Sequence, residues 1–251
     1  AQMVIRYEDG TEELFVTDES WSGADAPVVF AEIYDGEIYD GAKEIKGWSE
    51  AGCTAGQWKP VRKLDYDFSV LTGQGSGKVS LRDEVKPKEI FETPEGDLVI
   101  DFGLNMSALI QVNATGKKGD VIRLDCFEVL DSKGNVYLDN LRGAKESLQY
   151  TFGEDGTITY RPSFTFMGFR YAKIVSFPGT PEPGNFIAHA IHTNMERTGF
   201  LETSNPDLNQ LAHNILWGLK SNFVDVPTDC PQRDERLGWT GDAEIFCRTA
   251  C

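Results

Sequence analysis

The sequence lacks the long apolar stretch that a membrane-spanning helix requires. No run approaches the ~18 consecutive apolar residues of such a helix. The first residues also lack the charged and then apolar pattern of a signal peptide. We therefore expect a soluble protein that makes no membrane contact and from which any export signal has been removed.

Cysteine is scarce and unevenly placed. The chain has 5 cysteines in 251 residues, an odd number spread widely, so a disulfide framework is not expected. Cys247 and Cys251 have the spacing of neighbours on a helix, but no histidine or second cysteine pair lies beside them, and no calcium-loop pattern of alternating acids occurs. We expect no metal site and no cofactor in these residues, and calcium dependence is left open. Free cysteines are compatible with the cytoplasm and a trimmed start with the periplasm or secretion, which leaves the compartment open.

Basic residues are too few and too scattered for a nucleic-acid surface. The chain carries 24 Lys and Arg against 40 Asp and Glu, a net charge of -16, and its basic residues often stand beside acids, as in residues 86–89 and 233–236. Nucleic-acid binding neutralises phosphates with clustered basic side chains, so we expect no nucleic-acid partner. Hydrophobic residues make up 40% of the chain, enough to bury a core.

From about residue 28 to 200, short alternating runs rich in β-branched and aromatic residues are separated by glycine-containing turns. The runs include residues 97–102, 108–112, 121–124 and 169–175. This pattern predicts an antiparallel β-sandwich. His189 and His192 lie in an apolar run, where their odd separation on a strand points them to opposite faces, so they are expected to be structural histidines.

The region before residue 65 has too few strands to close a sandwich, and we interpret it as the tail of another β-domain. Residues 71–79 contain several glycines, but Thr72 stands where a phosphate-binding loop needs its first glycine and Val79 where it needs a Ser or Thr for magnesium. A flexible linker between β-domains is predicted there instead.

After residue 199 the pattern becomes helical. Ser204 or Asn205 can cap a helix whose first position suits Pro206, and one apolar stripe follows at Leu208, Leu211, Ile215 and Leu219. A second helix is expected from about Gly241. One and a half helices cannot bury an amphipathic stripe by themselves, so the chain resembles a piece of a larger protein.

Residues 225–244 form a loop that is dense in charge and stiffened by turn formers. They contain six acids, two arginines, a tryptophan, two prolines and two glycines. Carboxylates that accept hydrogen bonds from sugar hydroxyls, with an indole against the apolar side of the ring, would form a sugar subsite. Neighbouring arginines keep some of these carboxylates ionised, whereas a poorly solvated carboxyl keeps its proton. Glycoside cleavage with acid catalysis needs both kinds of carboxyl group in one site. The residues alone leave open a solvated loop or a structural salt-bridge network.

The run of residues 229–243 (DCPQRDERLGWTGDA) resembles the signature of bacterial α-L-rhamnosidases, glycoside hydrolase family seventy-eight. Residues 34–40 and 47–48 resemble the end of the family's N-terminal jelly-roll domain. The family's β-sandwich is resembled by residues 101–106, 127–131, 140–145 and 164–171.

The resemblance implies a mostly β fold. An antiparallel β-sandwich is preceded by the tail of another β-domain and followed by the first helices of a truncated (α/α)6 barrel. The implied domains are residues 1–65, the C-terminal part of a jelly-roll carbohydrate-binding-like domain, residues 66–199, the β-sandwich, and residues 200–251, the truncated start of the catalytic domain.

The resemblance also implies an enzyme that hydrolyses terminal non-reducing α-L-rhamnose with inversion, acting on rhamnose-containing glycosides or polysaccharides. By position, Glu235 matches the general acid, Asp229 and Asp242 match acids that hold sugar hydroxyls, Arg233 matches a further polar contact and Trp239 an aromatic wall. In the family the catalytic base comes from later in the barrel, so we name no base and expect the 251-residue chain alone to be inactive. The aglycone, the linkage and the oligomeric state are left open.

Two other functions remain open: a non-catalytic carbohydrate-binding or architectural β-module, and a hydrolase of the same architecture acting on another sugar. Sugar contact through residues 229–242 would favour the enzyme, whereas contact only through Trp21, Trp48 or the sandwich face would favour the module.

Overall fold

The computed structural model describes residues 1–73, 75 and 77–250. Gln74 and Ser76, in the predicted linker, and Cys251 lie outside the described residues. The chain divides into two compact units, residues 1–27 with 43–73, and residues 28–42 with the described part of 74–251. Residues 28–42 thus belong to the larger unit, and the domain boundaries expected at residues 65 and 199 stay predictions.

The smaller unit consists of two short antiparallel pairs joined by loops. Strands β1 (Gln2–Arg6) and β2 (Glu12–Val16) form a hairpin, and β3 (Ser22–Gly23) pairs with β6 (Lys59–Pro60). A 3-10 turn, η2 (Phe68–Val70), is capped by the Asp67 side chain, which accepts from the Ser69 N–H at 2.9 Å. Most side chains of this unit are exposed.

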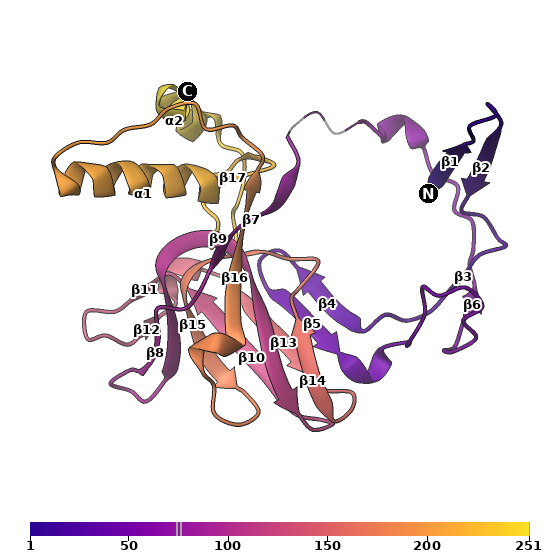
Figure 1. Ribbon diagram of the computed structural model, residues 1–251, viewed down its shortest axis with the longest axis horizontal. Coiled ribbons are helices and arrows are strands. Elements are labelled where there is room, and N and C mark those ends of the chain that lie inside the picture. Colours follow the sequence, from indigo (N-terminus) through magenta and orange to yellow (C-terminus); the bar gives the residue numbers. More distant parts are fainter. Residues whose placement is uncertain (74, 76, 251) are drawn as a thin grey trace. The chain divides into compact units, whose positions relative to one another are not determined.

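The larger unit is built on one sheet, which contains 10 strands among the described residues (Figure 1). Its order is β4-β5-β13-β10-β15-β9-β16-β7, and β8 and β14 also pair with β9. All of these pairs are antiparallel except β5 with β13. The strands are β4 (Val28–Glu32), β5 (Gly36–Asp40), β7 (Val79–Val85), β8 (Glu89–Glu92), β9 (Leu98–Gly116), β10 (Val121–Phe127), β13 (Ser147–Thr151), β14 (Gly156–Tyr160), β15 (Met167–Ser176) and β16 (Phe186–Thr193).

Shorter elements complete this unit. Two small hairpins pair β11 with β12 and β17 with β18. These elements are η1 (Gly41–Lys43), β11 (Val129–Leu130), β12 (Val136–Tyr137), η3 (Asp139–Leu141), η4 (Pro183–Asn185), β17 (Phe223–Val224) and β18 (Val226–Pro227).

Strand β9 is the longest element of the sheet, and it joins two runs that the sequence separates, residues 97–102 and 108–112. Figure 1 shows it bending as it crosses the sheet. Its pairing with β15 shifts register between Phe169 and Tyr171, which breaks the simple alternation of side chains there. Because of this bend, one strand pairs with β8, β14, β15 and β16 along its length.

The core of the larger unit lies inside the curve of the sheet. Its fully buried large side chains include Phe152, Phe169, Phe186, Ile100 and Met106. A buried carboxylate, Glu37, is satisfied by the Tyr160 hydroxyl at 2.7 Å and by the N–H groups of Ser163 and Phe164 at 2.9 and 2.8 Å. Burial of these aromatic and aliphatic side chains is the main favourable contribution to the fold.

His189 and His192 are buried in β16, as structural histidines would be. His189 Nε2 lies 3.2 Å from the Gln111 side-chain oxygen, and His192 Nδ1 lies 2.8 Å from the Thr193 carbonyl oxygen.

Two α-helices follow the sheet, α1 (Pro206–Asn222) and α2 (Thr240–Ala250). Asn205 caps α1 through a bond from the Asp207 N–H at 2.9 Å, and Pro206 occupies the first turn, as the sequence predicts. The helix lies against β9 and β16, with Trp217 packed on the core. The predicted apolar stripe does not make this contact, because Leu208, Leu211 and Ile215 are exposed.

The prediction of a mostly β fold with a helical C-terminal part is confirmed. Cys53, Cys126, Cys230 and Cys247, the cysteines that the structure describes, are all unpaired. In the described part of the chain, no helix has the length and apolar character needed to cross a membrane.

The ion pair between Asp101 and Arg170 predicts a pH-dependent contribution to stability. Burial acts to raise the pKa of the Asp101 carboxyl, but the Arg170 guanidinium (2.8 and 2.9 Å) and the Gly103 N–H (2.6 Å) outweigh it and lower the pKa. A lowered carboxyl pKa stabilises the folded state above the unfolded pKa of about 3.9, and this stability is lost as pH falls through the folded pKa. Asp101→Asn should therefore lower the free energy of unfolding by about 1–3 kcal/mol at pH 7 and by less at pH 3, which lies below the unfolded pKa.

Urea unfolding at the two pH values measures this difference. The exposed Glu95→Gln is the matched control and should cost little at either pH. An equal loss for Asp101→Asn at pH 7 and pH 3 would contradict the assignment.

Candidate active site

The charged loop of residues 225–244 runs from the β17–β18 hairpin to the start of α2. Its central part, residues 228–239, is called the carboxylate loop below. The Thr228 N–H donates to the Asn222 carbonyl at 2.7 Å, and the Asp229 N–H donates to the Leu237 carbonyl at 3.0 Å, which closes the loop on itself. One side of the loop is buried (Cys230, Pro231, Gln232 and Arg236) and the other is exposed (Leu237, Gly238 and Trp239).

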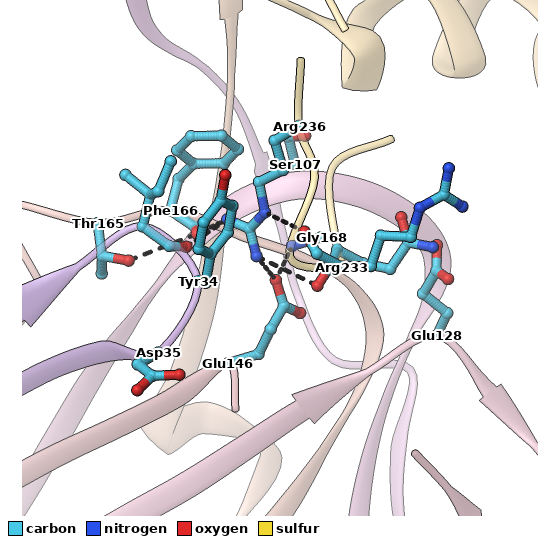
Figure 2. A network of polar contacts seen from close by, with 12 residues as sticks. Tyr34, Asp35, Ser107, Glu128, Glu146, Thr165, Phe166, Gly168, Arg233 and Arg236 are labelled. Carbon is cyan, nitrogen blue, oxygen red and sulfur yellow. Dashed lines mark hydrogen bonds and ion pairs between the residues drawn. The ribbon is translucent and has the colours of Figure 1, made fainter. Parts of the chain in front are cut away.

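Arg236 anchors the buried side of this loop to the sheet. Its guanidinium donates to Glu146 Oε1 at 2.5 Å, to the Phe166 carbonyl at 2.9 Å and to the Ile33 carbonyl. It also lies over the rings of Tyr34 and Phe166, 5.5 and 5.0 Å from their centroids. Figure 2 shows this group enclosed by residues from separate stretches of the chain. One side chain therefore joins the carboxylate loop to segments far away in sequence.

The partner carboxyl, Glu146, is fully buried and adopts a backbone φ of 48°, in the left-handed region. Arg236 has a similar φ of 51°. Non-glycine residues adopt this conformation at a cost that the surrounding contacts must offset. Burial raises the pKa of the Glu146 carboxyl, while Arg236 and the Gly168 N–H, at 3.0 Å, act against that rise.

Gly168 on β15 lets the loop approach the sheet closely. A side-chain carbon at this position would lie 2.6 Å from the Pro231 carbonyl carbon, closer than any unbonded contact allows. The backbone of the carboxylate loop thus lies directly on β15.

Glu235, Arg233 and Asp229 form a bonded chain on the loop. Arg233 donates to Glu235 Oε2 at 2.9 Å and to Asp229 Oδ2 at 2.9 Å. Glu235 Oε2 accepts a second cationic donor, Arg142 Nη1, at 2.8 Å, and Glu235 Oε1 accepts the Trp239 indole N–H at 3.0 Å. The Tyr34 hydroxyl donates to the Glu235 carbonyl at 2.8 Å, so both the backbone and the side chain of Glu235 are held.

Asp229 is held as a carboxylate. Its burial acts to raise the pKa, but the Leu237 N–H at 3.0 Å, the Cys230 thiol and Arg233 outweigh burial and lower the pKa. The neighbouring Cys230 is the opposite case, since its burial raises the pKa of the thiol. The loop therefore presents a charged Asp229 beside a neutral thiol.

Trp239 and Asp242 lie on the open side of the site. Trp239 is 50% exposed although its indole N–H is bonded, so part of its ring is free to contact a ligand. Asp242 is exposed in the first turn of α2, outside the bonded network. Both Asp229 and Asp242 line a cavity of about 530 Å³, together with Asn222, Phe223, Pro227, Thr228 and Phe246 among others.

Three protein-family models match the chain. The alpha-L-rhamnosidase N-terminal domain matches residues 1–82, the bacterial alpha-L-rhamnosidase concanavalin-like domain residues 91–192, and the bacterial alpha-L-rhamnosidase 6 hairpin glycosidase domain residues 196–251. An alpha-L-rhamnosidase of Streptomyces avermitilis is 40% identical over 251 residues, all of this chain and 24% of the relative. The chain belongs to the bacterial α-L-rhamnosidase family. A second relative, an alpha-L-rhamnosidase of Alteromonas sp., is 37% identical over 98% of this chain and 27% of its own length.

Solved structures of α-L-rhamnosidases share the fold. The Streptomyces avermitilis alpha-L-rhamnosidase complexed with L-rhamnose has a TM-score of 0.93 at 39% identity, covering 99% of this chain and 24% of that chain. The native Aspergillus terreus enzyme has a TM-score of 0.92 at 39% identity, covering 98% and 29%. This chain therefore spans about a quarter of the length of the curated relatives it matches.

Three residues that build the site of this rhamnosidase-family chain could not be found from its sequence. Tyr34, Arg142 and Glu146 come from the larger unit's sheet and its loops, and each bonds the carboxylate loop directly. The sequence runs 34–40 and 140–145 contain the first two and resemble the family, but nothing in the sequence links them to Glu235. Only the folded chain brings them together.

Asp229, Cys230 and Glu235 are the group of possible metal ligands that the described residues bring together, with ligand atoms within 4.8 Å of one another. Their oxygens already accept bonds from Arg233, Arg142, the Leu237 N–H and the Trp239 indole. Guanidinium groups supply the positive charge that a metal ion would bring, so these residues do not fit a metal site.

The anchor predicts a large loss of stability when Arg236 is removed. Arg236→Met leaves the buried Glu146 carboxyl and several carbonyl oxygens without their donor, so the free energy of unfolding should fall by about 3–5 kcal/mol. Arg123→Met is the matched control, because Arg123 pairs with Asp125 near the surface and should cost less than about 1 kcal/mol.

Urea unfolding of the three proteins measures both values. The double variant Glu146→Gln with Arg236→Met should be less damaged than the sum of the single variants. A loss for Arg236→Met no greater than that for Arg123→Met would show that the pair does not anchor the loop.

Proposed function

We propose that this chain is part of an enzyme that hydrolyses terminal non-reducing α-L-rhamnosides with inversion, and that Glu235 is its general acid. The observation that carries the proposal is the bonding of Glu235, whose two oxygens have different partners. The proposal is supported by relatives named alpha-L-rhamnosidase and by a similar structure that holds L-rhamnose.

The asymmetry at Glu235 selects the oxygen that carries the proton. Two guanidinium groups donate to Oε2, whereas Oε1 accepts only the neutral indole N–H of Trp239. Oε2 is occupied by two cationic donors, so we assign the proton transfer to Oε1. As the glycosidic bond breaks, this proton passes to the leaving oxygen, and the bonding electrons leave with that oxygen.

Asp229 serves as a sugar-binding carboxylate rather than as the second catalytic group. Inverting enzymes separate their two carboxyl groups by about 6.5–9.5 Å to admit the attacking water. The ligand atoms of Asp229 and Glu235 lie within 4.8 Å of one another, and both Asp229 oxygens already accept bonds. No residue of this chain is assigned as the base.

Trp239 and Asp242 form the outer part of the sugar site. The exposed part of the Trp239 ring offers an apolar surface for the sugar, including the methyl group of this 6-deoxy hexose. Asp229 and Asp242 share one cavity, so their carboxylates can accept hydrogen bonds from neighbouring hydroxyls of one ring. Arg233 bonds both Asp229 and Glu235 and so fixes the two carboxyl groups relative to each other.

Replacement of the acid tests the chemistry. In the full-length protein, Glu235→Gln should lower kcat on a nitrophenyl α-L-rhamnoside by about 10²- to 10⁴-fold, because the amide cannot donate the required proton. KM should change little, since the amide keeps the shape of the side chain. Glu89→Gln, an exposed carboxyl on β8, is the control with normal turnover expected.

Loss of rhamnose binding with turnover retained in Glu235→Gln would reassign Glu235 to substrate positioning. The isolated 251-residue chain, assayed in parallel, should show no turnover, because the proposed mechanism needs a base that this chain does not supply.

Replacement of an aromatic side chain distinguishes the enzyme from a binding module. Trp239→Ala should weaken binding of L-rhamnose by about tenfold, the loss expected for one aromatic contact. Trp48→Ala, which removes a 66% exposed indole of the smaller unit, should leave binding unchanged. Titration calorimetry on the full-length protein measures both, and the reverse result would favour a carbohydrate-binding module.

A further inference from the structure

The two carboxylates of the site share one arginine of their own loop. Asp229 and Glu235 each accept a bond from Arg233, and their ligand atoms lie within 4.8 Å of each other. Arg233 is therefore shared between the two carboxyl groups, and within the carboxylate loop Glu235 has no second cationic partner among the described residues.

Arg142 supplies that partner from elsewhere in the fold. It lies 93 residues before Glu235, directly after η3 and between strands β12 and β13 of the larger unit. Its Nη1 donates to Glu235 Oε2 at 2.8 Å, while the Arg142 side chain is 57% exposed and the Glu235 side chain 21% exposed. The site therefore depends on a residue outside the helical segment that carries the acid.

The segment that carries Arg142 is itself held in place. Leu141 is buried, its N–H donates to the Leu138 carbonyl at 2.9 Å, and the Ala144 N–H donates to the Leu141 carbonyl at 3.1 Å. The side chain of Asn140 donates to Glu128 at 2.8 Å. The backbone at Arg142 is thus held by contacts that do not involve Glu235.

The backbone at Arg142 adopts a strained, left-handed conformation next to this contact. Arg142 has φ 56° and ψ -112°, a conformation that glycine adopts readily and arginine rarely does. The next residue, Gly143, approaches the carboxylate loop so closely that a side-chain carbon there would lie 2.8 Å from Asp234 Oδ2. Strain of this kind persists where the surrounding structure requires it, and it often marks a functional site.

We propose that Arg142 is a positioning residue for the acid, which orients the Glu235 carboxyl by fixing Oε2 and offsets the negative charge of the neighbouring Asp229. This inference rests on the proposed function of Glu235. The groups that face the Glu235 carboxyl are Arg142, Arg233, Asp229, the Cys230 thiol and the Trp239 indole N–H. Arg142 is the one member of this set that comes from outside the carboxylate loop.

The test compares Arg142→Gln and Arg142→Lys in the full-length protein. Arg142→Gln should lower kcat on a nitrophenyl α-L-rhamnoside by about 10- to 100-fold, since a misplaced group reacts slowly. KM should stay within about twofold, as expected when ground-state binding is intact.

Arg142→Lys retains a cation at this position and should recover kcat in part, because lysine lacks the planar fork of arginine. Lys145→Gln is the matched control. It removes a positive charge from the same segment, but Lys145 pairs with Asp35 and not with Glu235, so its kcat and KM should match the wild type.

Arg142→Gly separates positioning from folding. Glycine relieves the positive φ, so the unfolding temperature should not fall, while kcat should drop as in Arg142→Gln. A purely structural role predicts instead that Arg142→Gly, which is not destabilised, keeps the wild-type kcat.

The outcomes distinguish the two proposals. If the wild-type protein does not cleave rhamnosides, or if Glu235→Gln remains active, the proposed function fails. If Glu235→Gln is inactive but Arg142→Gln retains the wild-type kcat, Arg142 is not a positioning residue and the proposed function stands.

Discussion

The guanidinium of Arg236 is buried among groups that the chain supplies from widely separated positions. It bonds Glu146, the carbonyls of Ile33 and Phe166, and its own loop. A buried guanidinium must direct its N–H groups at fixed acceptors, so it accepts one arrangement of these segments and disfavours others. An apolar side chain would fill the space without specifying direction. The position of the carboxylate loop on the sheet therefore depends on this one side chain.

The same anchor also places Glu235, the proposed general acid. Glu235 precedes it directly, so fixing Arg236 on the sheet also fixes the adjacent Glu235 backbone, to which Tyr34 adds a bond. Because both Glu146 and Arg236 have positive φ, the chain turns sharply where the two segments meet. The buried face of the loop serves stability, and the opposite, exposed face carries Trp239, which is bonded to the partly exposed Glu235 carboxyl.

The β-sheet unit is accordingly more than a support for the helical part that carries Glu235. Gly168 permits contact between backbones, Glu146 receives Arg236, and Arg142 reaches the carboxyl of Glu235. Family models place these residues and the carboxylate loop in different domains of the α-L-rhamnosidase family. Groups from both domains therefore set the electrostatic environment of the Glu235 carboxyl, and a substitution of such a group in either domain alters that environment.

The sequence by itself determined the features that local rules control. Alternating runs predicted the strands, Asn205 and Pro206 marked the start of α1, and the density of prolines, glycines and acids identified the carboxylate loop. It did not show that β9 is one bent strand or that α1 packs on the core through Trp217, because both depend on which surfaces meet. The bonds of Arg142, Glu146 and Tyr34 to the loop could not be predicted either, because the bonded residues are 93, 90 and 201 positions apart in the sequence. Periodicity and capping act within a few residues, whereas the partners of a buried charge are chosen by the packing of the whole sheet.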